Sequence, residues 1–331
     1  MNFLQKNNSI RFRIILLVLI GTLALILVVY TVSVLVISRS YLKIEKDDIT
    51  KNIQRVDDTI HEYMERLTIS ASDWAFWDDT YQFIQDRNKD YTQTNLGNVS
   101  ISNLKINSMV FVNVKGEIVF KKMIDIENAQ EVSSESIGSY VASQKKLTTH
   151  EDVKSSPAGL IMLPEGLSFI ASRPILTSSK EGPIQGSIIF SKFLDDSVIQ
   201  SVQETTHVSF KIYNLNSPIL PDDVVLAKLE IDNGNTYFVN PVSRDSVSGY
   251  TILNDLDGNP LAMIKIDNPR TFFKQGESTI SIFMNTTSIL IVLLSTILLF
   301  FIERIVVSRL LLLTKEVEKI STTGELSSKV K

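Results

Sequence analysis

The sequence contains no cysteine and only three histidines (His61, His150 and His207) in 331 residues. The absence of cysteine excludes a disulfide scaffold, thiol catalysis and a cysteine-ligated metal site. Charged residues make up 21% of the chain and apolar residues 44%, which disfavours disorder and a nucleic-acid-binding tail. These values fit an exported domain that is large enough to be held together by its core alone.

Sequence motifs for catalysis are also missing. The chain has no P-loop, no kinase ATP-binding motif, no G-G-D-E-F-like run, no G-x-S-x-G and no G-x-G-x-x-G. His61 is followed by Glu62, but no second histidine comes four residues after it, so a zinc motif is excluded and a solvated helix surface is expected. We therefore predict no catalytic residue, no metal site, no cofactor and no nucleic-acid partner for this chain.

Two long apolar runs dominate the hydropathy pattern. Residues Ile14–Ile37 and Ile280–Ile302 contain no charged residue, and each exceeds the roughly 20 residues that a helix needs to cross a bilayer. A cleaved signal peptide would have a shorter apolar stretch that ends in a small-residue site, which is absent around Ser38. The sequence thus predicts two membrane-spanning helices in contact with lipid.

The distribution of charge predicts the topology. Residues 1–37 carry +3 (three basic, no acidic), residues 280–331 carry +2 (six basic, four acidic) and residues 38–279 carry −9 (24 basic, 33 acidic). Short basic tails stay on the cytoplasmic side of a membrane. We expect a multi-pass protein of the cell membrane with both termini inside and residues ~38–279 outside.

A heptad-like seam follows the first apolar run. Its apolar positions are spaced by alternating steps of four and three residues and are Ile49, Ile53, Val56, Ile60, Tyr63 and Leu67. The same period continues through Ser70, Trp74, Trp77, Tyr81 and Ile84. The pattern predicts one long helix whose aliphatic half is a dimer stalk and whose aromatic half docks on a globular domain.

Beyond Asn95 the pattern changes to short strands separated by turn residues. Ser108–Asn113 and Glu117–Lys122 flank a Val-Lys-Gly turn and predict a hairpin. Strands are expected at Leu167–Ser172 and Gln185–Phe190, and helices at Ser133–Leu147 and Asp195–Glu204. A second group of strands is expected at Val208–Tyr213, Thr236–Val239, Tyr250–Leu253 and Leu261–Ile266. The fold class is α/β with mixed antiparallel sheets, because no βαβ alternation is present.

The predicted order of parts along the chain is as follows. A cytoplasmic tail (1–13) precedes the first span (14–37), a stalk helix (38–94), a membrane-distal unit (95–204), a membrane-proximal α/β unit (205–275), the second span (280–302) and a short cytoplasmic helix (303–331). This last helix has apolar residues at Leu310, Leu313, Val317 and Ile320, again in steps of three and four.

One run of residues resembles a known family. The stretch Asp73–Phe83 reads D-W-A-F-W-D-D-T-Y-Q-F and resembles the signature of the fourth CHASE-type extracellular sensory domain. Similar stretches follow at 91–96, 172–184 and 257–270, and residues 308–326 resemble the first helix and connector of a HAMP relay module, without its second helix. The resemblance implies a PAS-like, Cache-related sensory domain of a membrane sensor, of which the relatives are typically histidine kinases or diguanylate cyclases.

The candidate ligand-binding residues are Trp74, Trp77, Asp78, Asp79, Tyr81 and Arg173. The aromatic residues are either core packing or the wall of a sensory pocket. Arg173 follows an apolar strand and is either an ion-pair partner of Asp73, Asp78 or Asp79, or an anchor for a ligand carboxylate. The resemblance implies that the ligand lies in the membrane-distal unit, at residues ~95–195.

Two functions remain compatible with the sequence. The first is a homodimeric receptor that senses an extracytoplasmic small molecule and relays the signal through its HAMP-like helix to an absent or separate cytoplasmic output. The alternative is a membrane-anchored protein that binds a solute or a partner without signalling.

Overall fold

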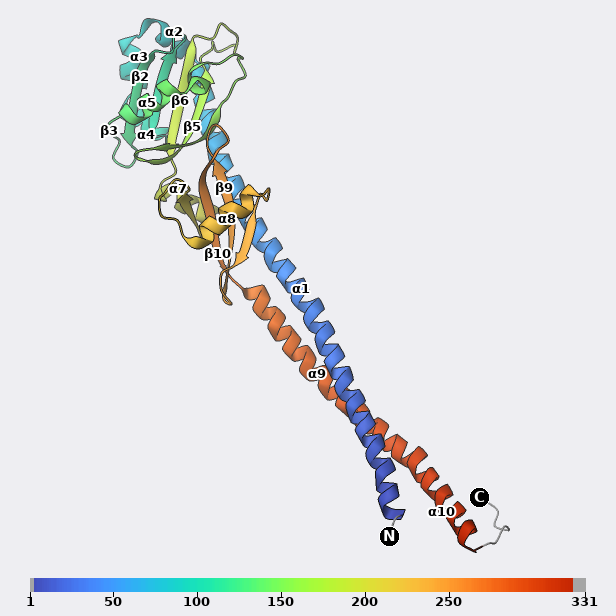
Figure 1. Cartoon of the computed structure of the whole chain (residues 1–331). Helices are drawn as coiled ribbons and strands as arrows, with labels where there is room; N and C mark the ends of the chain where they lie inside the picture. Colours follow the sequence, from blue (N-terminus) through green and yellow to red (C-terminus); the bar gives the residue numbers. More distant parts are fainter. Residues whose placement is uncertain (1–2, 324–331) are drawn as a thin grey trace. The chain divides into compact units, whose positions relative to one another are not determined.

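The computed structural model describes the backbone of residues 3–323 and the side chains of residues 11–317. Two compact units divide the chain. The helical unit comprises the first 46 residues together with the chain from Arg270 onward, and the sheet unit comprises Asp47–Pro269. The helix α1 (Phe3–Ala75) contributes residues to both units (Figure 1).

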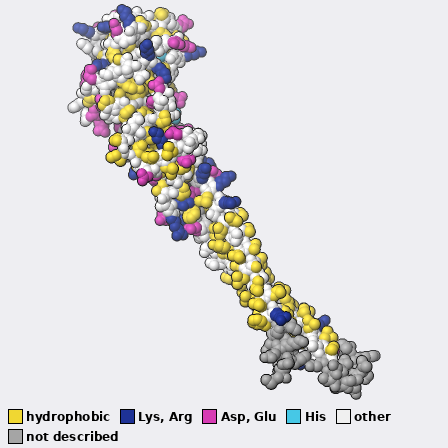
Figure 2. All heavy atoms as spheres, in the orientation of Figure 1, with side chains coloured by type: hydrophobic (Ala, Val, Ile, Leu, Met, Phe, Trp, Pro, Cys, Tyr) yellow, Lys and Arg dark blue, Asp and Glu magenta, His cyan; other side chains and the backbone are white. Residues whose placement is uncertain are grey.

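The helical unit consists of the first part of α1, α9 (Thr271–Phe301), the π-helical segment η1 (Ile302–Val307) and α10 (Ser308–Thr323). Both α1 and α9 are long and apolar enough to cross a membrane, and Figure 2 shows hydrophobic side chains over their described parts. The hydroxyl of Thr22 donates a hydrogen bond to Ser295 Oγ at 2.8 Å. The predicted two-span architecture is confirmed.

A buried ion pair lies within the helical unit. The carboxylate of Glu45 accepts hydrogen bonds from Arg270 Nε at 3.1 Å and from Arg270 Nη2 at 3.0 Å. The two side chains are 5% and 8% exposed, and the guanidinium also lies 4.0 Å from the ring centroid of Phe273. This pair joins α1 to the residue that precedes α9.

The sheet unit contains a six-stranded antiparallel sheet of order β3-β2-β1-β6-β5-β4. Its strands are β1 (Ser108–Asn113), β2 (Ile118–Asp125), β3 (Gln130–Val132), β4 (Ala158–Leu163), β5 (Gly166–Pro174) and β6 (Gly186–Phe193). The predicted hairpin is confirmed as the β1–β2 pair, whereas β3 and the edge strand β4 were not anticipated. On one face, α5 (Glu135–Ser143) and α6 (Lys145–Thr148) cover Val110, Ile170 and Ile189.

The second sheet has four antiparallel strands in the order β7-β10-β9-β8. Its strands are β7 (Phe210–Asn214), β8 (Phe238–Pro241), β9 (Ser246–Asn254) and β10 (Pro260–Pro269). The helix α7 (Asp196–Thr206) connects the two sheets along the chain, and α8 (Asp222–Asp232) packs its Val224 and Ala227 against Tyr250. The α/β class with antiparallel sheets is confirmed.

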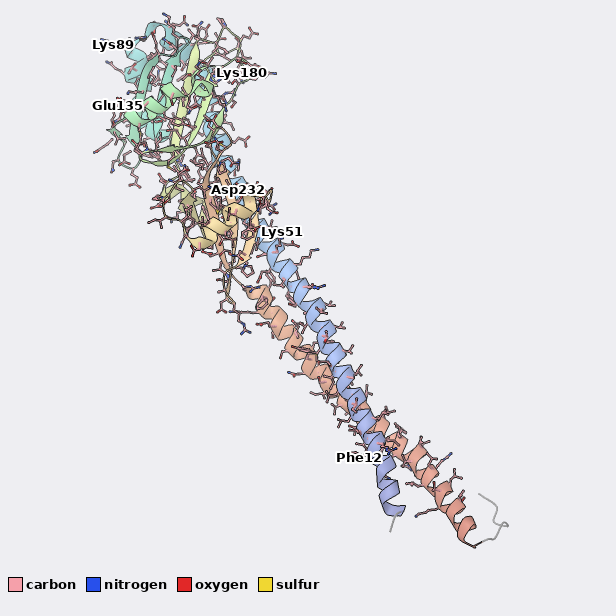
Figure 3. All side chains as sticks on the ribbon, in the orientation of Figure 1. Phe12, Lys51, Lys89, Glu135, Lys180 and Asp232 are labelled. Carbon is pink, nitrogen blue, oxygen red and sulfur yellow. The ribbon has the colours of Figure 1, made fainter. Side chains whose placement is uncertain are left out.

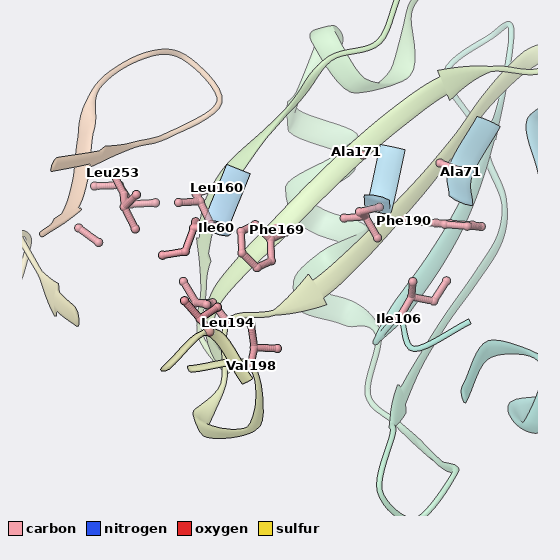
Figure 4. Close-up of a cluster of buried hydrophobic side chains, with 14 of the residues drawn as sticks. Ile60, Ala71, Ile106, Leu160, Phe169, Ala171, Phe190, Leu194, Val198 and Leu253 are labelled. Atoms are coloured by element: carbon pink, nitrogen blue, oxygen red, sulfur yellow. The ribbon is translucent and has the colours of Figure 1, made fainter. Parts of the chain in front are cut away.

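The apolar stripe of α1 forms part of the core of the sheet unit. Ile49, Ile53, Val56, Ile60 and Leu67 are at most 4% exposed, and they join residues from both sheets in one hydrophobic cluster. Figure 4 shows Ile60 of α1 together with Leu160, Phe169 and Leu253. The inference that this stripe is an exposed coiled-coil seam is wrong, because strands of the same chain supply its apolar cover.

The prediction of one helix through residue 94 is also wrong. Helix α1 ends at Ala75 and is followed by α2 (Asp78–Asp86), α3 (Lys89–Asn95) and α4 (Asn98–Asn103). Trp77 has extended backbone angles (φ −106°, ψ 130°), and the carbonyl of Ala75 accepts a hydrogen bond from the Leu176 backbone N–H. A loop thus partners the end of α1, while Asp78 and Asp79 favour a new helix start through the helix dipole.

Candidate ligand-binding site

The two tryptophans of the signature lie at the end of α1 against the six-stranded sheet. The ring of Trp74 meets the ring of Phe190 edge-on, with centroids 6.5 Å apart, and it meets Trp77 at 5.6 Å. Trp74 is half-buried, whereas Trp77 is 43% exposed. Trp74 therefore contributes to the core, and Trp77 offers an accessible aromatic surface.

The aspartate and tyrosine of the signature contact the loop between β5 and β6, residues 175–185. The Asp78 carboxylate accepts a hydrogen bond from the Ser178 backbone N–H at 2.9 Å, and this bond lowers the pKa of Asp78. The hydroxyl of Tyr81 donates to the Pro183 carbonyl at 3.3 Å and accepts from Gln185 Nε2 at 3.3 Å. Asp78 and Tyr81 thus fix this loop, on which Figure 3 labels Lys180.

Asp79 lies away from that loop. It is exposed and lines a shallow depression of about 280 Å³ together with Gln82, Asn88 and Asp90. The structure therefore separates Asp79 from Arg173, although the sequence analysis grouped them in one candidate site.

Arg173 lies near the end of β5 and does not pair with an aspartate of the signature. Its Nη1 donates to the backbone carbonyls of Ser155 at 3.1 Å and Lys154 at 3.3 Å. Its guanidinium lies 5.3 Å from the ring centroid of Phe76. Within the described part of the chain, Arg173 Nε is the buried side-chain nitrogen or oxygen atom that lacks a hydrogen-bond partner. The expected ion pair is thus replaced by bonds to the segment before β4.

His150 belongs to this segment and links it to Ser172 of β5, and sequence reasoning missed it. Ser172 Oγ donates to the Leu147 carbonyl at 2.6 Å and therefore accepts from His150 Nε2 at 3.0 Å. Nδ1 then accepts from Ser155 Oγ at 2.9 Å. Burial, with a smaller effect of Arg173, lowers the pKa of His150 to about 4, so the ring is neutral at neutral pH. No pattern in the sequence identifies such a histidine.

The segment 149–157 borders a hollow of about 610 Å³. Lys145, Lys146, Thr149 and Ser155 contribute to its lining, with Glu151, Asp152 and Pro157. Ser172 and Arg173 of β5 both form hydrogen bonds with this segment, so a movement of the segment would also displace β5. Among the described residues, no group of three or more potential metal ligands occurs.

The sheet unit thus consists of two antiparallel sheets packed on the helix α1, which extends into an apolar segment. Residues 59–213 match the CHASE4 domain. This match, over just under half of the chain, confirms the resemblance of the signature run to a CHASE-type sensory domain.

Known proteins with similar sequences or structures include a histidine kinase and two periplasmic domains. The methanogenesis regulatory histidine kinase FilI of Methanothrix harundinacea (strain 6Ac) is 24% identical over 270 residues, which are 81% of this chain and 30% of that protein. The periplasmic domain of Vibrio cholerae LuxQ aligns with a TM-score of 0.44 and 12% identity, over 66% of this chain and 98% of that one. The periplasmic sensory domain of the Campylobacter jejuni chemoreceptor Tlp1 aligns with a TM-score of 0.42 and 11% identity, over 70% and 98%.

Proposed function

We propose that this chain is the sensory part of a receptor that detects an extracytoplasmic small molecule and relays it to an output of the histidine kinase or diguanylate cyclase type. Residues ~38–279 face outward and both termini are cytoplasmic. The connection of the elements carries this proposal. Helix α1 runs without interruption from the first apolar segment into the core, and the central strand β10 ends at Pro269, two residues before α9 begins. Displacement of the sheets is thereby conveyed to both membrane helices.

The ligand site of this receptor lies on the six-stranded sheet around Arg173 and the segment 149–157. Arg173 has a buried donor group without a protein partner, and the adjoining hollow is lined by Lys145 and Lys146 together with Glu151 and Asp152. Glu151 and Asp152 balance the two lysines, so the Arg173 guanidinium is the group that favours a ligand carboxylate. Trp77 adds an exposed aromatic surface, whereas Asp78 and Tyr81 act by holding the loop 175–185.

Relay and dimerisation are assigned to α10. Leu310, Leu313 and Val317 recur at steps of three and four residues and are 53%, 50% and 64% exposed. Such a seam fits the HAMP-like helix of a homodimer, in which a second copy covers it. The dimer contact is thus placed here rather than on the stripe from Ile49 to Leu67.

The relay is tested by joining residues 1–331 in frame to the kinase half of a histidine kinase. Gly159→Ala is the informative change, because a Cβ there would lie 2.7 Å from Leu256 Cα. The turn between β9 and β10 must therefore move away from β4. We expect the autophosphorylation rate in membrane vesicles to change at least twofold, in either direction.

Gly97→Ala is the matched control, because a Cβ at Gly97 has no neighbour within 4 Å. It should leave the autophosphorylation rate unchanged. Equal rates for both variants at equal membrane levels would favour the anchored binding protein over the receptor.

Topology is tested separately by adding cysteines to a chain that has none. A cysteine at Lys180 should react with an impermeant maleimide in intact cells, and cysteines at Asn8 and Lys331 should not. Labelling of either terminus would contradict the proposed orientation.

A further inference from the structure

A second cavity lies elsewhere in the sheet unit, at the point where the two sheets and α1 meet. Its volume is about 470 Å³, within the range of roughly 300–1,000 Å³ typical of small-molecule sites. Residues of α1, β4, β5, α8, β9 and β10 line it, so it is built from parts of the chain that are far apart in sequence. None of its lining residues belongs to the candidate site at Arg173.

The floor of this junction cavity is apolar. Ile60, Leu160, Phe169 and Leu253 are each at most 3% exposed, and Figure 4 shows their side chains together. Met64, Ala158, Ile231 and Ile252 add half-buried apolar surface to the lining. A ligand that enters must therefore present an apolar body, which gains free energy as water leaves the cavity.

The lining carries three carboxylates and one titratable imidazole. Asp57, Asp232 and Asp255 contribute carboxylates, His61 contributes an imidazole, and the lining contains no lysine or arginine. The carboxylate of Asp255 is already engaged by the turn between β9 and β10. It accepts hydrogen bonds from the backbone N–H groups of Asp257 at 2.9 Å and Asn259 at 2.8 Å. Asp232 lies at the exposed end of α8, as labelled in Figure 3.

Asp57 is the carboxylate that lies next to the apolar floor. It is half-buried, one turn of α1 before Ile60. His61 Nδ1 lies 2.9 Å from the Asp57 backbone carbonyl and 3.6 Å from the carboxylate oxygen, so His61 forms an ion pair with Asp57 only when it is protonated. Burial and the neighbouring Asp58 raise the pKa of Asp57 while His61 lowers it, so an additional cation would stabilise the ionised form.

We propose that the junction cavity binds a small organic cation, with an ammonium group at Asp57 and an apolar body over Ile60, Leu160, Phe169 and Leu253. The cation supplies a permanent opposite charge next to Asp57, in addition to that of His61 when it is protonated, and the apolar body displaces water from the floor. The occupant touches α1, β4 and β9 at once. It thereby fixes the six-stranded sheet against the four-stranded sheet, whose strand β10 leads to α9. This site is independent of the proposed carboxylate site at Arg173.

Binding is tested on the full chain in nanodiscs with three probes that share one body: 2-phenylethylamine, 2-phenylethanol and 3-phenylpropionate. Saturation-transfer NMR and calorimetry are run against empty nanodiscs to remove partitioning into lipid. We expect 2-phenylethylamine to bind at least tenfold more tightly than the alcohol, and the carboxylate not to bind.

Two matched variants assign the selectivity to one side chain. Asp57→Asn should abolish the preference for the amine over the alcohol. Asp58→Asn removes the same charge from the exposed neighbouring position and should retain it. Ala158→Leu, which fills the cavity from its wall, should weaken the binding of all probes at least tenfold while leaving the unfolding midpoint within a few degrees.

The proposal is overturned if the wild-type protein shows no saturable binding of 2-phenylethylamine at concentrations up to about 10 mM. It is also overturned if Asp57→Asn binds the amine as tightly as Asp58→Asn does. Because binding is measured directly, either result leaves the relay proposal and its kinase fusion unaffected. Conversely, if Gly159→Ala leaves the autophosphorylation rate of the kinase fusion unchanged, the binding result is not affected.

Discussion

Gly249 of β9 packs directly against Ile49 and Ile53 of α1, and its replacement by alanine tests the packing of that helix. A Cβ at this position would lie 2.5 Å from Ile49 Cγ2 and 2.5 Å from Ile53 Cδ1. Carbon atoms prefer separations of about 3.5–4.0 Å, so each isoleucine must retreat by about 1 Å. Both are at most 1% exposed, which leaves little room for that movement.

The expected cost follows from two opposing effects. Overpacking a core costs about 1–3 kcal/mol, whereas removing a glycine from a strand returns about 0.5–1 kcal/mol. Gly249→Ala should therefore lower the free energy of unfolding by about 1–2 kcal/mol. Gly97→Ala should be close to neutral, because φ −70° and open space accommodate a Cβ while the N-cap position of α4 mildly prefers glycine to alanine.

The measurement is urea unfolding of the full chain in detergent micelles, followed by circular dichroism, with midpoints compared at equal slopes. A double mutant sharpens it. Ile53→Val removes the Cδ1 atom that the new methyl group meets, so Gly249→Ala with Ile53→Val should be less destabilised than the sum of the single changes by at least ~0.5 kcal/mol. Strict additivity, or a Gly249→Ala protein as stable as Gly97→Ala, would refute the packing of α1 described above.

Three further outcomes are expected. A cysteine at Leu313 should cross-link two chains in membranes and a cysteine at Ile53 should not, because Ile53 is buried within its own chain; the reverse result would restore the coiled-coil stalk. The pKa of His150 is lowered from 6.5 to about 4, so the stability that depends on its neutral form is complete above pH 6.5 and is lost as the pH falls toward 4. Replacing His150 with Gln should flatten the urea midpoint across that window, whereas the exposed His207→Gln should not. Glu45→Gln should destabilise the protein by about 3–5 kcal/mol, because it removes the carboxylate that pairs with the buried Arg270 charge. The control, Glu65→Gln at an exposed position, should cost less than about 0.5 kcal/mol. Equal unfolding midpoints for the two variants would show that the ion pair contributes nothing to stability.

The sequence was sufficient for the membrane segments, the fold class and the sensory family. Uncharged runs, turn residues and the signature run are formed by residues close together in the sequence, so they can be recognised without the structure. The periodicity of α1 was read correctly as well, since the stripe from Ile49 to Leu67 is indeed one buried face. Its partner was misjudged, because periodicity identifies a face that must be covered and not what covers it.

The details of the candidate site depended on contacts that no local pattern carries. Arg173 bonds to carbonyls 18 and 19 residues before it, and backbone acceptors leave no mark in a sequence. His150 is placed by Ser155 and Ser172, which are ordinary serines when read alone. The end of α1 at Ala75 was missed for a related reason, since a loop a hundred residues later supplies the hydrogen bond that terminates it.

The unbroken course of α1 sets a rule for building hybrid receptors from this chain. An α-helix turns by about 100° and advances about 1.5 Å with each residue. A junction placed between Lys46 and Ile49 that gains or loses one residue would therefore rotate everything before it by that angle, while the buried stripe stays fixed in its core. Two hybrids that differ by a single inserted residue should behave differently, and insertion of seven residues should nearly restore the original phase. The number of residues inserted in this helix thus determines the rotation of the membrane segment about the helix axis. Hybrids should therefore be compared by this rotation before they are compared by sequence.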